Sequence, residues 1–164
     1  MDKILDGVLA FKENIFPQYQ DLFSDLAGGQ SPEVLLVTCA DSRIDPSLIT
    51  QSNPGDLFIC RNAGNIVPPY GPDAEGNVAS IEFAVAALGV KHIVVCGHTD
   101  CGAMKGAMNP EGLDALPHVC GWVAHSAAAV DAAKEARPEL DGKELLKEVT
   151  EQNVLLQLKN LKTH

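Results

Sequence analysis

The hydrophobic pattern of the chain alternates between helical spacing and short, continuous apolar runs. Helical spacing in four regions predicts helices over residues 2–26, 78–88, 119–135 and 143–161. Three short segments predict strands, and they lie at 34–37, 56–61 and 92–96. The four consecutive apolar residues of the first are typical of a strand buried on both faces of a sheet, and the third is also expected to be buried. Pro17 divides the first helical region into two helices. The Gly- and Pro-rich segment 62–76 predicts a loop.

Strands that alternate with helices in this order predict an α/β fold, with a mostly parallel central sheet flanked by helices. The 164 residues are enough for one globular domain with a substantial core, and no internal repeat divides them. We therefore expect a single domain over residues 1–164, in which N-terminal helices (1–27) precede an α/β core (28–164).

The composition argues against several classes of protein. The net charge of −10 argues against nucleic acid as a partner, because an acidic surface repels a phosphate backbone. No run reaches the ~18 apolar residues of a membrane span, and the N-terminus lacks the pattern of a signal peptide. Five cysteines, an odd number, argue against a secreted disulfide scaffold. We expect a cytoplasmic protein, with a microcompartment or an organelle left open.

Potential metal ligands follow two of the three predicted strands. Cys39, Asp41 and Arg43 come directly after the first strand, and His98 and Cys101 come after the third. The carboxyl ends of neighbouring parallel strands meet at one edge of the sheet. Alternate residues share one side of an extended segment, and residues three apart share one face of a helical turn. Two thiolates, an imidazole and a carboxylate suit zinc, whereas magnesium and calcium prefer oxygen ligands.

Two readings other than a catalytic zinc site stay open. Taken singly, each residue could be a buried cysteine, a core histidine or part of a surface ion pair. Alternatively, Asp41 could complete the shell of a purely structural zinc. If Arg43 instead holds the Asp41 carboxylate in a bidentate pair, the fourth zinc position is open to water. Zinc then lowers the pKa of that water and yields a hydroxide nucleophile.

Three segments resemble motifs of the β-class carbonic anhydrases, above all those of plant and cyanobacterial members. They are CADSR at 39–43, PGDLFICRNAGNIVPPY at 54–70 and GHTDCG at 97–102. The resemblance implies that family's Rossmann-like fold, a zinc cofactor and a homodimer or higher homo-oligomer. It also implies that the usual C-terminal strand is lacking, because the sequence stops at His164.

The same resemblance implies a role for each matching residue. Cys39, His98 and Cys101 would bind zinc. Asp41 would be a fourth ligand or the partner of zinc-bound hydroxide, with Arg43 beside it in a catalytic dyad. Further residues would contact the substrate, namely Gln30, Phe58, Gly102 and Phe83, the last of which stands where many members have tyrosine.

The implied function is the zinc-dependent, reversible hydration of carbon dioxide to bicarbonate and a proton, a carbonate dehydratase (lyase) activity. Two rival functions remain: a hydrolase of carbonyl sulfide or carbon disulfide on the same scaffold, and an inactive, zinc-stabilised assembly module. Asp100, inside the second motif, is expected to face solvent or to cap the turn that follows it.

Overall fold

The computed structural model describes residues 1–71 and 76–164. The central strands are β1 (Val34–Cys39), β2 (Leu57–Asn62) and β3 (His92–Cys96). The α-helices are α1 (Asp2–Ala10), α2 (Gln20–Leu26), α3 (Pro46–Thr50), α4 (Gly76–Glu82), α5 (Gly102–Met108), α6 (Pro117–Val123), α7 (Ala127–Ala136) and α8 (Gly142–Leu161). Short π- and 3-10 segments join them: η1 (Phe11–Ile15), η2 (Phe16–Tyr19), η3 (Phe83–Ala87), η4 (Pro110–Leu113) and η5 (Ala124–Ser126).

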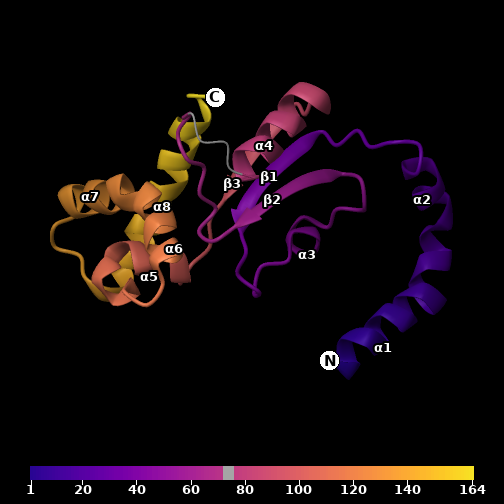
Figure 1. Cartoon of the computed structure of the whole chain (residues 1–164), viewed down its shortest axis with the longest axis horizontal. Helices are drawn as coiled ribbons and strands as arrows, with labels where there is room; N and C mark the ends of the chain where they lie inside the picture. The colour runs from indigo at the N-terminus through magenta and orange to yellow at the C-terminus, as the bar shows by residue number, and fades with distance from the viewer. Residues whose placement is uncertain (72–75) are drawn as a thin grey trace.

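The predicted α/β architecture is confirmed. The three strands form one parallel sheet in the order β2-β1-β3, so the first strand of the chain lies at the centre. Figure 1 shows the sheet between two groups of helices, with α1 and α2 stretched out at one end and α5 to α8 gathered at the other. Within the described residues, no helix has the length and apolar character that crossing a membrane requires.

One face of the sheet carries a hydrophobic core. Leu35, Val37 and Cys60 pack there against Ile81 and Ala84, which come from α4 and η3. A second core lies beyond the carboxyl ends of the strands, where α5, α7 and α8 meet. It contains Cys39, Ile66, Cys101, Met104, Val130, Ala133, Leu146 and Val149. Two predicted metal ligands are therefore part of a packed core and not of a surface loop.

The expectation of a buried strand is confirmed for β1 but is wrong for β3 in this single chain. Ile59, Leu36 and Val94 lie side by side across the sheet. Leu36 at the centre is 4% exposed, but Ile59 and Val94 on the two outer strands are 38% and 43% exposed. Successive residues of a strand point to opposite faces of the sheet. The next row, with Cys60, Val37 and Val95, therefore faces the core. This face of the sheet is covered only at its middle.

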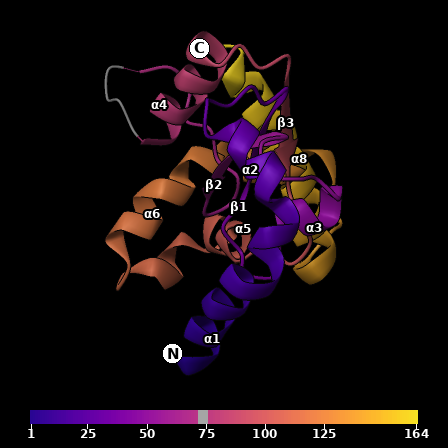
Figure 2. The same ribbon diagram turned by 90° about the vertical axis from the view of Figure 1, so that its right-hand side faces the viewer.

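The N-terminal helices form an arm over residues 2–26. Pro17 lies in the first turn of η2, at the predicted break, and the helical path continues on either side of it. None of the four segments in the arm buries a residue. Figure 2 shows α1 projecting past the rest of the chain. The apolar stripe that predicted these helices therefore faces outward, with Ile4 68% and Val8 60% exposed.

The other predicted helices are present, with finer divisions. The region 78–88 forms α4 and η3, the region 119–135 falls within α6, η5 and α7, and α8 covers the last one. The predicted loop is found, although its residues 72–75 lie outside the described part. The short helix α3 was not predicted; the Asp45 side chain caps it by accepting a hydrogen bond from Leu48 N–H.

Candidate metal centre

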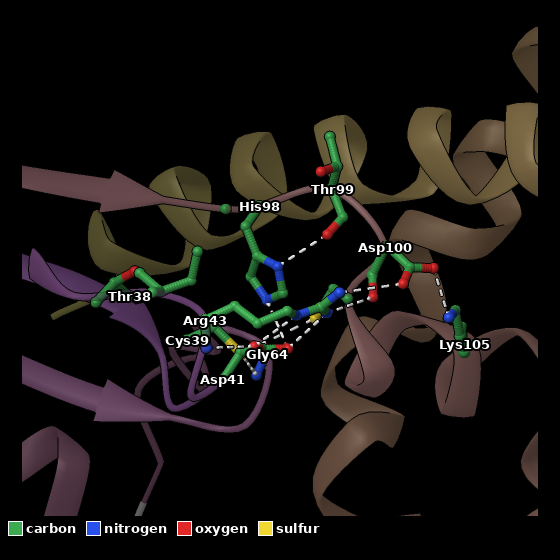
Figure 3. A network of polar contacts seen from close by, with 12 residues as sticks. Thr38, Cys39, Asp41, Arg43, Gly64, His98, Thr99, Asp100 and Lys105 are labelled. Carbon is green, nitrogen blue, oxygen red and sulfur yellow. Dashed lines mark hydrogen bonds and ion pairs between the residues drawn. The ribbon is translucent and has the colours of Figure 1, made fainter. Parts of the chain in front are cut away.

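Three potential ligands meet at the carboxyl edge of the sheet. Cys39 is the last residue of β1, and His98 and Cys101 lie on the segment between β3 and α5. Because β1 and β3 are parallel neighbours, with Thr38 opposite Cys96, their ends deliver these residues to the same place. Figure 3 shows the His98 ring directed toward Cys39 and the Asp41–Arg43 pair. The predicted juxtaposition of the two motifs is thus present.

The ligand atoms are close enough for one ion. The two Sγ atoms and a His98 ring nitrogen all lie within 4.8 Å of one another. The Cys39 and Cys101 sulfurs are 4.0 Å apart, and two thiolates at ~2.3 Å from a tetrahedral zinc would be about 3.8 Å apart. Burial raises the pKa of the Cys101 thiol, and the N–H groups of Met104 and Ala103 act in the opposite direction. A bound cation would favour the thiolate.

His98 provides an independent test of this fit. Its Nδ1 lies 2.9 Å from the carbonyl oxygen of Thr99, and a carbonyl only accepts hydrogen bonds, so Nδ1 carries the proton. Nε2 therefore presents a lone pair. It is buried and has no hydrogen-bond partner among the described residues, which is costly for a polar atom unless a ligand occupies that position. Histidines that bind metal through one nitrogen usually anchor the other in this way.

Asp41 lies beside the three ligands but is held by Arg43. Arg43 Nε donates to Asp41 Oδ1 at 2.9 Å, and Arg43 Nη2 donates to Asp41 Oδ2 at 2.8 Å. These hydrogen bonds hold the pKa of the Asp41 carboxyl well below its usual range. Asp41 Oδ2 is 3.8 Å from His98 Nε2, but Asp41 does not belong to the cluster that Cys39, His98 and Cys101 form. In this arrangement the donor set consists of two sulfurs and one nitrogen.

Asp100 contributes an anchor that the sequence did not predict. Its carboxylate pairs with Arg43 Nη1 at 3.2 Å and with Lys105 Nζ at 2.5 Å. Its backbone oxygen accepts a further hydrogen bond from Arg43 Nη2 at 3.1 Å. Of the two expectations for Asp100, exposure to solvent is confirmed, since its side chain is 54% exposed. The alternative, a cap on the following turn, is wrong, since α5 begins after Cys101 without a side-chain cap. Asp100 instead joins the two motifs through Arg43 (Figure 3).

The predicted substrate-contacting residues fall into two places. Gly102 begins α5, directly after the ligand Cys101. Phe58 pairs with Leu35, which lies four residues before Cys39 on β1. At ~3.3 Å per residue, Phe58 is therefore about 13 Å from the level of Cys39 along the strands. Phe83 packs against Phe58, with ring centroids 6.0 Å apart. Gln30 is exposed and precedes β1, at the opposite end of that strand from Cys39. This chain therefore does not bring Gln30, Phe58 or Phe83 to its own ligand cluster.

Comparison with known sequences identifies relatives along the whole chain. Residues 34–164 match the model of a family described as carbonic anhydrase. Proteins named carbonic anhydrase from Synechocystis and from Pseudomonas aeruginosa are 44% and 48% identical to the chain over its full length. The chain spans 60% of the length of the Synechocystis protein and 74% of the Pseudomonas protein.

Solved structures give the same result. The chain matches the structure of the β-carbonic anhydrase CcaA with a TM-score of 0.96 at 44% identity, covering 100% of this chain and 74% of the other. It matches a tetrameric β-carbonic anhydrase from Sordaria macrospora with a TM-score of 0.84 at 34% identity, covering 99% of this chain and 81% of that one. The resemblance inferred from the three motifs is therefore confirmed, with a cyanobacterial protein among the relatives.

Proposed function

We propose that this chain, which belongs to the β-class carbonic anhydrase family, catalyses the reversible hydration of carbon dioxide to bicarbonate and a proton. The observation that carries the proposal is the cluster of Cys39, His98 and Cys101, in which the buried His98 Nε2 has no hydrogen-bond partner within residues 1–71 and 76–164. A purely structural zinc would need a fourth protein ligand. The carboxylate in reach, Asp41, is engaged by Arg43.

Cys39, His98 and Cys101 would hold the zinc ion. Bound zinc would act as a Lewis acid that lowers the pKa of water to about 7. Asp41 remains ionised beside this position, because Arg43 stabilises its charged form. Its Oδ2, on the side of His98, can accept a hydrogen bond from the incoming nucleophile and so orient a lone pair toward carbon dioxide. Arg43 is itself fixed by Asp100, so the carboxylate is held away from the donor set.

The substrate pocket requires more than one copy of the chain. Gly102 is the one predicted substrate contact that lies next to the ligands of its own chain. Phe58 and Phe83 form an aromatic pair about 13 Å away along the strands. We propose that these two residues, together with Gln30, serve the metal centre of a partner subunit. The existence of a related β-carbonic anhydrase described as tetrameric supports an assembled protein.

Two exposed apolar surfaces support a homodimer or a larger homo-oligomer. One is the sheet face with Ile59 and Val94, and the other is the N-terminal arm. Single chains rarely leave contiguous apolar surfaces in water, because their burial is favourable. We propose that residues 1–27 and 28–164 form one domain in which the arm serves assembly. A reducing compartment such as the cytoplasm is also proposed, and it fits five cysteines that are all free thiols.

Stopped-flow hydration of carbon dioxide by the zinc-loaded chain tests the proposal. We expect turnover at pH 7 that increases at pH 8.5, because zinc acidifies water to a pKa near 7. Asp41→Asn is the matched variant, since it preserves shape while removing the charge that Arg43 holds. One zinc per chain without turnover would overturn the proposal and favour a structural zinc. Hydrolysis of carbonyl sulfide without hydration of carbon dioxide would reassign the substrate.

A further inference from the structure

The Cys39 sulfur receives a hydrogen bond from outside the ligand set. The backbone N–H of Gly64 donates to Cys39 Sγ, with an N···S distance of 3.3 Å, and both groups are buried. Gly64 lies on the loop directly after β2, and Figure 3 shows it beside Cys39. A donor at this sulfur withdraws charge from the thiolate, so the orientation of this peptide affects how strongly Cys39 binds a metal.

The carbonyl group of the same peptide is held by Trp122. The indole N–H of Trp122, on α6, donates to the oxygen of Ala63 at 2.7 Å. The Ala63 carbonyl and the Gly64 N–H belong to one planar peptide unit. The hydrogen bond from Trp122 and the hydrogen bond to Cys39 are therefore made by opposite sides of the same peptide. Polarisation of the carbonyl by the indole makes the N–H a better donor to sulfur. Trp122 is the sole tryptophan of the chain.

Asn153 fixes the other side of Gly64. Its Nδ2 donates to the Gly64 oxygen at 3.0 Å. Its Oδ1 accepts hydrogen bonds from Ser126 Oγ at 2.8 Å and from Gln157 Nε2 at 2.7 Å. These two donors leave only one orientation for the amide, and the side chain is 0% exposed. A fully satisfied polar network of this kind is rigid, so the loop is tied to α8 at this point.

Gly64 itself is required by the close approach. Its φ is +85°, in the region that favours glycine, and a Cβ would lie 2.9 Å from Ala103 Cβ and 3.0 Å from Met104 Cε. Ala103 and Met104 belong to the first turn of α5, directly after the ligand Cys101. Gly64 thus lies between Cys39 Sγ and the first turn of α5, with the carbonyl before it held by α6 and its own carbonyl held by α8.

We propose that Trp122 is a positioning residue of the metal centre, which acts through the 63–64 peptide on the sulfur of Cys39, and that Asn153 fixes Gly64 from the following peptide, 64–65, through the Gly64 carbonyl oxygen. The proposal rests on the metal centre of the proposed function but not on its catalytic activity. Loss of the indole donor leaves the Gly64 N–H less polarised and less fixed. The Cys39 thiolate then becomes more electron-rich, and its position relative to His98 and Cys101 becomes less defined.

Cobalt(II) substitution provides the test, because the thiolate-to-cobalt charge-transfer band reports the electron density on sulfur directly. The variants are Trp122→Phe and a chain with benzothienylalanine at 122, in which a sulfur atom replaces the indole N–H at nearly constant shape. We expect the band to move to longer wavelength in both, and in Asn153→Ala. We also expect the zinc Kd, measured by chelator competition, to increase by about tenfold, the lower end for outer-shell partners of metal ligands. The reason is the less defined position of Cys39, which outweighs the stronger donation of its thiolate.

Val123→Ala is the matched control, since Val123 is the buried apolar neighbour of Trp122 on α6. It should lower the unfolding midpoint without moving the band. A band at the wild-type wavelength in both Trp122 variants would overturn the proposal, whatever their stability. Absence of a thiolate band in the cobalt-loaded wild-type chain would overturn the metal centre and this proposal together. A third outcome is a wild-type chain that shows the thiolate band, with the expected shift in the variants, but does not hydrate carbon dioxide. That outcome would overturn only the proposed activity.

Discussion

Substituting Gly97 by alanine tests how tightly α8 sets the position of His98. Gly97 follows β3 and directly precedes the ligand. A Cβ built on Gly97 would lie 2.9 Å from Val154 Cγ2 and 3.5 Å from Thr150 Cγ2, both on α8. Carbon atoms pack best at about 3.5–4.0 Å, so the strand end and the helix must separate by roughly 0.6–1 Å.

The expected cost follows from two opposing effects. Overpacking of this size destabilises by about 1–3 kcal/mol, whereas alanine restricts the unfolded chain and returns about 0.4–1 kcal/mol. We therefore expect Gly97→Ala to lower the free energy of unfolding by about 1–2 kcal/mol. Because His98 moves with the strand end, turnover should fall more steeply, by about 10- to 100-fold.

A double-mutant cycle decides whether this contact is the cause. Val154→Ala removes the methyl group that the new Cβ meets, so Gly97→Ala/Val154→Ala should be about as stable as Val154→Ala and should regain most of the turnover. Urea unfolding at fixed protein concentration and stopped-flow hydration are the assays. Gly121→Ala, where a Cβ meets nothing within 4 Å, is the control and should not destabilise. Simple additivity of the Gly97 and Val154 substitutions would refute the reasoning.

Four further predictions concern the dyad, the metal and the assembly. Arg43→Lys keeps the charge but loses the bidentate pair, so turnover should drop by at least about tenfold with unchanged circular dichroism. The lowered pKa of Asp41 means that its pair with Arg43 contributes stability above the unfolded-state pKa of about 3.9 and loses it as the pH falls below that value. The unfolding midpoints of wild type and Asp41→Asn should therefore converge in acid but differ at pH 7. Chelation of zinc should expose Cys39 and Cys101 to alkylation, as two added groups by mass spectrometry. Val94→Lys, on the exposed sheet face, should shift sedimentation toward the monomer, and unchanged assembly would exclude that face as an interface.

The sequence predicted the cluster of Cys39, His98 and Cys101 because two simple periods were sufficient. Continuous apolar runs located the strands, and the parallel connection then brought Cys39 and His98 to the same edge of the sheet. The orientation of Asp41 also followed from sequence, since a side chain two residues from Arg43 can reach it without tertiary information. Local spacing, in other words, determines the centre of the site.

The features that were missed depend on backbone conformation and on distant partners. Asp100 adopts a positive φ of 57°, which turns its carboxylate toward Arg43 and Lys105, and no apolar pattern encodes that turn. The helix α3 has only five residues, too few for a periodic signal, but the Asp45–Pro46 pair at its start was a cue. The role of Asn153 was hidden for another reason, because a buried polar residue on α8 is indistinguishable by sequence from a solvated one.

The uneven burial of the sheet connects these observations to the proposed assembly. The apolar residues that follow His92 predicted a buried third strand, but Val94 is half-exposed in the single chain. A sequence records the burial of the assembled protein, so an apolar position that one chain leaves open indicates a surface that another chain covers. The same logic applies to Phe58 and Phe83, which pair with each other far from the ligands of their own chain. Both discrepancies fit the proposed assembly, in which the unit that buries the sheet and completes the pocket is larger than this single chain.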